Sequence, residues 1–206
     1  MASAIPITRD RVAPEKADAI REAVRTAKRL PLTGGHSRRA EPGDAAALCE
    51  FLSDPAVYAP IYTLPVPLTD DTVCDFIVDH EAQAAAGEGL LFLRMNETGA
   101  VMGYSDFQIW PQWGAGELGG ALHPNLQSQG AGARGAAATF DWMFSTLGLD
   151  LICETATPDN VRTARLLDGL GFKRMGEVQS TRPDGSTRRS LVWEITRAAW
   201  QSRHPA

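Results

Sequence analysis

The chain has 206 residues, of which 44% are apolar and 22% charged, which fits an ordinary globular protein of one domain with room for an appendage. Its net charge of -5 argues against a general nucleic-acid binder, which would usually be basic. No apolar run reaches the ~18 residues of a membrane span, and the first residues lack the apolar stretch of a signal peptide. We therefore expect a cytoplasmic protein whose separated cysteines, Cys49, Cys74 and Cys153, are reduced core residues.

Residues 1–36 are predicted to form an N-terminal extension with one helix, from Pro14 to Leu30. One face of this helix is basic, and such a face is more often solvated than bound to an acidic partner or a second subunit. Pro31 and Gly34-Gly35 end the pattern. The apolar residues that recur at helical spacing are Ala17, Ile20, Val24 and Ala27.

The compact domain is predicted to span residues 37–206, and its first half alternates short strands with helices. Asp44 and Thr69 are expected to cap two helices, and Ser53-Asp54-Pro55 to break the first of them. In chain order, the expected elements are a strand at 37–40, helices at 44–52 and 71–86, and hairpin strands at 90–96 and 101–110.

The second half continues with strands and helices and ends in a hairpin around Pro183-Asp184-Gly185. This mixed order predicts an α/β (α+β) fold in which helices are layered on one sheet. The expected elements are strands at 117–122 and 149–155, helices at 133–147 and 157–169, and hairpin strands at 173–181 and 187–194.

A glycine-rich loop, Gln127 to Gly132, connects an apolar strand to the helix that begins near Ala133. Small residues at the start of a helix leave backbone N–H groups unpaired at the positive end of the helix dipole. The loop therefore predicts an anion site, most naturally for a phosphate group.

One interpretation of this loop is a dinucleotide site, because residues 130–135 match G-x-G-x-x-G and Glu154 lies about 20 residues further on. Two features argue against it. Residues 123–129 separate the strand from the first glycine, and the chain closes with a hairpin where further βαβ units would be needed. A purely structural glycine turn is the other alternative.

Several short motifs occur in order along the compact domain. They are Ser53-Asp54-Pro55, His123-Pro124, Gln127 to Gly132, Asn160 with Thr163, and Leu170-Gly171-Phe172. In these motifs residues ~37–196 resemble the GCN5-related N-acetyltransferases, in the subgroup that includes the RimJ/RimL-type N-terminal acetyltransferases. The glycine loop is similar to the family's Q/R-x-x-G-x-G/A loop, which holds the pyrophosphate of acetyl-CoA.

The resemblance implies one domain with a mixed, mostly antiparallel central sheet of six to seven strands, splayed in a V and flanked by helices. It implies acetyl-CoA as the cofactor, with its pantetheine arm inserted between the splayed strands. Arg134 would add charge near a phosphate and Arg165 would meet the 3′-phosphate, although both are also plausible as solvated residues. The implied cofactor-binding residues are Leu122, His123, Gln127, Gln129, Gly130, Ala131, Gly132, Ala133, Arg134, Asn160 and Arg165.

Transfer of an acetyl group to an amine needs a base for the amine proton and support for the leaving thiolate. Glu117 is the candidate base, because family members carry a glutamate here and its neighbours are nearly apolar, which would raise its pKa. Asp106 is the second candidate, and a structural salt bridge is the alternative role of Glu117. Thr163 stands where the subgroup often has serine, and no tyrosine is available nearby to protonate the thiolate.

The acceptor is expected to be a primary amine, such as a protein N-terminus, an amino acid, a polyamine or an antibiotic. Tyr58, Tyr62 and Trp110 are candidate acceptor-binding residues, with simple packing as the more common role of such side chains. His36 and His123 lack partners at metal-binding spacing, so we predict no metal. A homodimer is plausible by resemblance, and a non-catalytic acyl-CoA-binding module is the alternative to an enzyme.

Overall fold

A computed structural model describes residues 4–31, 36–58, 61, 63–126, 131–181 and 185–204, apart from the side chains of Ala56 and Ala131. Within these residues seven strands form one sheet in the order β1-β2-β3-β4-β5-β7-β6, and only β4 and β5 run parallel. This confirms the expected mixed, mostly antiparallel sheet. The strands are β1 (His36–Arg39), β2 (Gly89–Met95), β3 (Val101–Trp110), β4 (Ala115–Leu122), β5 (Leu151–Ala156), β6 (Lys173–Thr181) and β7 (Thr187–Thr196).

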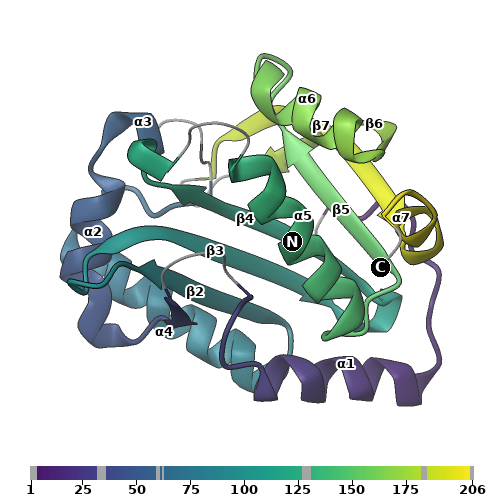
Figure 1. Cartoon of the computed structure of the whole chain (residues 1–206), viewed down its shortest axis with the longest axis horizontal. Coiled ribbons are helices and arrows are strands. Elements are labelled where there is room, and N and C mark those ends of the chain that lie inside the picture. Colours follow the sequence, from purple (N-terminus) through teal and green to yellow (C-terminus); the bar gives the residue numbers. More distant parts are fainter. Residues whose placement is uncertain are drawn as a thin grey trace.

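Helices cover both faces of the sheet. Figure 1 shows α5 crossing the sheet near β4 and β5, with α1 running along the lower side. The α-helices are α1 (Pro14–Thr26), α2 (Ala45–Leu52), α3 (Pro55–Tyr58), α4 (Asp70–Ala86), α5 (Ala131–Ser145), α6 (Val161–Leu170) and α7 (Arg197–Arg203). Short 3-10 turns lie at η1 (Pro42–Asp44), η2 (Pro111–Trp113) and η3 (Pro124–Leu126).

Alternating side chains of the strands divide the core between the two faces. Phe92 and Phe107 pack with residues of α1, α5, α6 and α7, whereas Leu91 and Leu93 pack with residues of α2, α3 and α4. Tyr104 belongs to the second group. This division places α4 and α5 on opposite faces, so that β3 and β4 lie between them.

The parallel pair β4 and β5 separates soon after it begins. Only Ala115 and Gly116 of β4 pair with β5, opposite Leu151 and Ile152, although both strands continue for several residues. The rest of β4 stays paired with β3 through Leu122. One edge of β4 is therefore unpaired in the ladder beyond Gly116, as the V-shaped sheet predicted from the resemblance requires.

Gly120 bends β4 at this opening. Its φ is +134°, a conformation that side chains strongly disfavour, and a Cβ there would lie 2.3 Å from the Tyr104 carbonyl oxygen. Glycine is needed at this position for both reasons, because the strand could not otherwise stay this close to β3.

The predicted helix caps have different outcomes. Thr69 caps α4 as expected, accepting a hydrogen bond from the Thr72 N–H. The prediction for Asp44 is wrong in its chemistry: both carboxylate oxygens lie 2.6 Å from the Arg38 guanidinium, and no side-chain bond caps α2. This hydrogen-bonded ion pair lowers the pKa of Asp44.

Helix α1 ends at Thr26, four residues before the predicted end. Arg39 donates hydrogen bonds to the carbonyl oxygens of Val24, Arg25 and Ala27. These bonds satisfy carbonyl groups at the end of the helix, which have no N–H partner within the helix. Helices α3 and α7 were not predicted, because each is too short to show a helical period.

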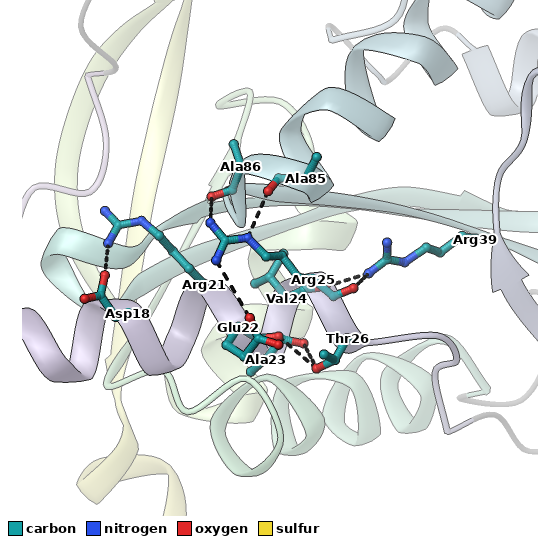
Figure 2. A network of polar contacts seen from close by, with 10 residues as sticks. All are labelled: Asp18, Arg21, Glu22, Ala23, Val24, Arg25, Thr26, Arg39, Ala85 and Ala86. Atoms are coloured by element: carbon teal, nitrogen blue, oxygen red, sulfur yellow. Dashed lines mark hydrogen bonds and ion pairs between the residues drawn. The ribbon is translucent and has the colours of Figure 1, made fainter.

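Two arginines join the N-terminal segment to the rest of the molecule (Figure 2). Arg39 caps α1, and Arg25 of α1 donates to the carbonyl oxygens of Ala85 and Ala86 at the end of α4. Cations at helix C-termini also interact favourably with the helix dipole. Part of the basic side predicted for this helix therefore binds the protein itself, and the division at residue 36 stays a prediction.

Candidate functional site

A cavity of about 1250 Å³ opens where β4 and β5 separate. One wall comes from α4 and β3, the other from the first turns of α5 and α6, and β4 lies between them. The cavity brings together five of the predicted site residues: Glu117, Leu122, Gly132, Asn160 and Thr163. The second candidate base, Asp106, also lines it.

Glu117 extends from β4 on the side of α4. Its Oε1 accepts a hydrogen bond from the Thr155 hydroxyl of β5 at 2.8 Å. The pKa of Glu117 is raised to about 7, chiefly by burial and in addition by the Asp106 charge, against the opposing effects of Thr155 and Arg188. A carboxyl with a pKa near neutrality is half-ionised at the pH where a base is needed.

Glu154 crosses the same opening from β5. Its Oε1 accepts a hydrogen bond at 2.9 Å from the Leu118 N–H, on the unpaired edge of β4. Burial and the nearby Glu117 charge hold the pKa of Glu154 well above its usual range. In the sequence, Glu154 was a candidate only for a dinucleotide site. The apolar residues Ile152 and Cys153 before it are the sequence signal that its side chain would be buried.

The first turn of α5 faces the start of α6. A Cβ on Gly132 would lie 3.9 Å from Nη2 of Arg162, so the guanidinium stands beside the exposed beginning of α5. Arg162 lines the cavity but was not predicted, because Arg134 and Arg165 were the arginines expected near the phosphates. Both of those are exposed residues of the described chain that do not line the cavity. Arg162 lies between Asn160 and Thr163, two residues that were predicted, and this position is the sequence signal that could have identified it.

Asn160 and Thr163 begin α6. The Asn160 side-chain oxygen accepts a hydrogen bond from the Thr163 N–H at 3.0 Å, which makes Asn160 the N-cap. Because this bond uses the side-chain oxygen, the amide NH₂ is the part of Asn160 that can donate to a ligand.

The remaining cofactor residues predicted from sequence lie elsewhere or are not described. Gln127, Gln129 and Gly130 lie outside the described residues, and Ala131 begins α5. His123 and Ala133 do not line the cavity as the structure describes it. The His123 ring accepts a hydrogen bond from the Asn125 N–H instead.

The aromatic acceptor residues predicted from sequence are not brought to the cavity. Tyr62 lies outside the described residues, and Tyr58 and Trp110 do not line the cavity as described. Trp110 packs in a separate cluster with Trp113 and Ile5, because it pairs with Ala115 at the end of β4 that is still joined to β5. This half of the cavity is instead lined by α4, through Thr72, Asp75, Phe76, Asp79, His80 and Gln83.

Two further properties concern metals and membranes. Among the residues in the described ranges, no three His, Cys, Asp or Glu side chains are grouped so as to hold a metal ion. No helix within those ranges is both long and apolar enough to span a bilayer.

The model of the acetyltransferase (GNAT) domain matches residues 37–173. The chain belongs to this family. The match starts where the compact domain was predicted to start and includes β1, the separated strands and α6. The antiparallel sheet, with β4 and β5 as its one parallel pair among the described strands, does not fit the dinucleotide alternative.

Relatives within the family agree with this assignment. N-acetyltransferase p20 of Bacillus licheniformis is 28% identical over 144 residues, covering 68% of this chain and 79% of that protein. The structure of a ribosomal-protein-S5-alanine acetyltransferase from Vibrio fischeri matches with a TM-score of 0.68 at 18% identity, over 84% of this chain and 99% of that one. Mycobacterium smegmatis RimJ, solved with CoA-disulfide, matches with a TM-score of 0.66 at 20% identity, over 85% and 90%. At these identities the solved structures show that the chain shares the fold of these acetyltransferases.

Proposed function

We propose that the protein is an acetyl-CoA-dependent N-acetyltransferase that moves an acetyl group to a primary amine by direct attack in a ternary complex. The feature that carries this proposal is the half-buried Glu117 carboxyl at the opening between β4 and β5, where its surroundings raise its pKa to about 7. A base at this point is what attack by an amine on a thioester requires.

The residues at the opening fit acetyl-CoA. Beyond Gly116 the edge of β4 is unpaired in the ladder, so its backbone can bond an extended arm as a neighbouring strand would. Gly132 and Arg162 suit the phosphates, since a helix beginning and a guanidinium both attract anions. The Asn160 amide can donate to the same arm. The loop at 127–130 remains part of this proposal by resemblance.

When bound, acetyl-CoA supplies an activated thioester. Glu117 takes the proton of the acceptor amine as the amine nitrogen forms the new bond to the acetyl carbon. The bond from that carbon to sulfur breaks, and the Thr163 hydroxyl donates a hydrogen bond to the departing thiolate. A backbone N–H near Leu122 supports the charge on the carbonyl oxygen. Alignment of the two substrates in the cavity supplies much of the remaining rate.

Glu117→Gln tests the proposal in an assay that follows thiol release from acetyl-CoA over a panel of amines. We expect kcat to fall by roughly 10²- to 10⁴-fold, because that is the usual contribution of a general base. Binding of CoA, measured by thermal shift, should be retained. Glu97→Gln, in the exposed turn after β2, is the matched control and should leave the rate unchanged.

Two results would overturn the proposal. A wild-type protein that binds CoA but acetylates no amine would be a non-catalytic acyl-CoA-binding module. A Glu117→Gln variant with the full rate and an unchanged pH profile would remove the assigned base.

A further inference from the structure

His80 of α4 lies in the acceptor half of the cavity and is 7% exposed. Its Nδ1 is 2.8 Å from the Phe76 carbonyl oxygen, and its Nε2 is 2.9 Å from Oδ1 of Asp106 on β3. A carbonyl oxygen only accepts hydrogen bonds, so Nδ1 carries a hydrogen. The second contact then requires another proton, either on Nε2 or on Asp106.

The pair of His80 and Asp106 is therefore electrically neutral in either arrangement. It holds one proton more than a neutral imidazole beside a carboxylate would. Burial lowers the pKa of His80, but the hydrogen bond and charge of Asp106, with the Phe76 carbonyl and Asp79, raise it above its usual value overall. The geometry and this balance agree that the pair holds the extra proton more tightly than a free histidine would.

Asp106 and Glu117 face the same side of the sheet on neighbouring strands. Asp106 pairs with Gly119 and Gln108 pairs with Glu117, so the two carboxyl groups are diagonal neighbours. No side chain of Gly119 stands beside Asp106, where a Cβ would lie 3.6 Å from the Asp106 Cβ. The Asp106 charge already raises the pKa of Glu117, and without His80 beside it that charge would oppose ionisation of Glu117 more strongly.

We propose that His80 is a positioning residue of the acetyl transfer: it holds Asp106 in a neutral pair, so that Glu117 can lose its proton near neutral pH and serve as the base. The inference rests on the proposed role of Glu117. His80 itself does not touch the reacting atoms. Its contribution is to fix one carboxylate and cancel its charge beside another.

The other charged groups around the pair are few among the described residues. On α4, Asp79 acts on His80 and Asp75 lines the same wall of the cavity. On β7, Arg188 acts on Glu117, and on β5 Thr155 donates to it, with Glu154 as the nearest further carboxyl. Strand β2 presents apolar Leu91 and Leu93 to the helices on this face, and its Arg94 lines the same cavity. Tyr104 beside Asp106 is a buried phenol.

The test is the pH profile of kcat/KM for His80→Gln, using an amine that the wild-type protein acetylates. Glutamine can donate to Asp106 but cannot cancel its charge. We expect the acid limb to move to higher pH by roughly half a unit to one unit, because the pKa of Glu117 rises beside an uncompensated anion. An equal loss at every pH, with the limb unmoved or moved to lower pH, would overturn the proposal.

Two variants complete the experiment. In His80→Gln/Asp106→Asn the uncompensated charge is gone, so the limb should return to within about 0.3 units of its wild-type position. A double variant whose limb stays displaced would contradict the proposal. His36→Gln, on the exposed edge strand β1, is the matched control and should leave the profile unchanged.

A measurement on the wild-type protein needs neither activity nor a folded variant. In ¹⁵N-histidine NMR the pair should keep its proton to above the ordinary histidine pKa of about 6.5. Loss of that proton below pH 6.5 would overturn the inference. Absence of acetyl transfer, with the proton retained, would instead count against the proposed function alone.

Discussion

Two glutamates in the same half of the sheet have very different surroundings. Glu194 of β7 is 4% exposed and meets the N-terminal strap, residues 4–13. Its oxygens accept hydrogen bonds from the Ile7 N–H at 2.7 Å, the Thr8 N–H at 3.0 Å and the Thr8 hydroxyl at 2.6 Å. Glu117 at the opening of β4 and β5 has one such bond, from Thr155, and a second carboxyl as its neighbour.

The difference separates a structural carboxylate from one suited to chemistry. Three donors support a buried negative charge, so Glu194 fixes the strap to the sheet. One donor supports it only in part, so Glu117 keeps an affinity for protons near neutral pH. Both side chains come from β-strands with apolar neighbours, and the number of hydrogen-bond donors distinguishes them.

Removing the charge at the structural site should have the largest effect on stability. Glu194→Gln turns one acceptor oxygen into an NH₂ group that faces the strap's own donors. We expect a loss of about 2–3 kcal/mol in the free energy of unfolding, with a fall in Tm of roughly 4–12 °C. Thermal denaturation measures the loss, and amide hydrogen exchange should rise at Ile7 and Thr8.

Glu177→Gln is the control for this substitution, because Glu177 is an exposed residue of the adjacent strand β6 that pairs with Arg189. An exposed ion pair of this kind contributes little, so its Tm should not change measurably. If Glu194→Gln left both the Tm and the exchange rates of the strap unchanged, the contrast between the two glutamates would be wrong.

The sequence predicted most of the fold because local signals there agree with the tertiary structure. β3 was placed correctly at both ends by its alternating pattern and turns, and Thr69 caps α4 as its position indicates. The predictions that failed depended on side chains of β1, outside the helices concerned. Arg39 ends α1 early from outside the helix, and Asp44 is drawn to Arg38.

The candidate site was predictable only where a motif fixed the position. Glu117, Asn160 and Thr163 were found by resemblance and line the cavity. His80 was missed because its partner Asp106 is 26 positions away along the chain. Trp110 was misplaced for a similar reason, since a strand pattern does not show which end of β3 will lie beside the opening.

Loss of the phosphate contact should have an intermediate effect, seen in binding. For Arg162→Ala we expect the KM for acetyl-CoA to rise about tenfold with kcat within twofold, because a charge-assisted hydrogen bond to a phosphate is lost. Steady-state kinetics with varied acetyl-CoA measures this. Lys173→Ala, an exposed residue at the start of β6, controls for the loss of one positive charge.

A parallel Arg165→Ala variant decides between the two arginines of α6. Arg165 is the residue that family resemblance favours, whereas Arg162 is the one beside Gly132. A larger rise in KM for Arg165→Ala than for Arg162→Ala would return the phosphate contact to Arg165. It would also show that the beginning of α5 does not receive the phosphates through Arg162.

Replacing Glu117 by glutamine should have the smallest effect, a gain in stability that is opposite in sign to the loss at Glu194. The pKa of Glu117 is about 7 in the folded protein, above its ordinary value, so the folded state binds this proton more tightly than the unfolded chain does. The stability that Glu117 contributes is complete below its ordinary pKa and is lost as the pH rises through 7.

Glu117→Gln removes this dependence on pH. At pH 8 the variant should be more stable than the wild type by about 1–2 kcal/mol, after allowance for the partial exposure of the side chain. At pH 5 the gain should be much smaller, because the folded carboxyl is then protonated and keeps its contact with Thr155, and only the unfolded chain has begun to lose the proton. Urea denaturation at both pH values measures the difference. A gain of equal size at pH 5 and pH 8 would mean that packing, and not a buried charge, distinguishes Glu117 from Glu194.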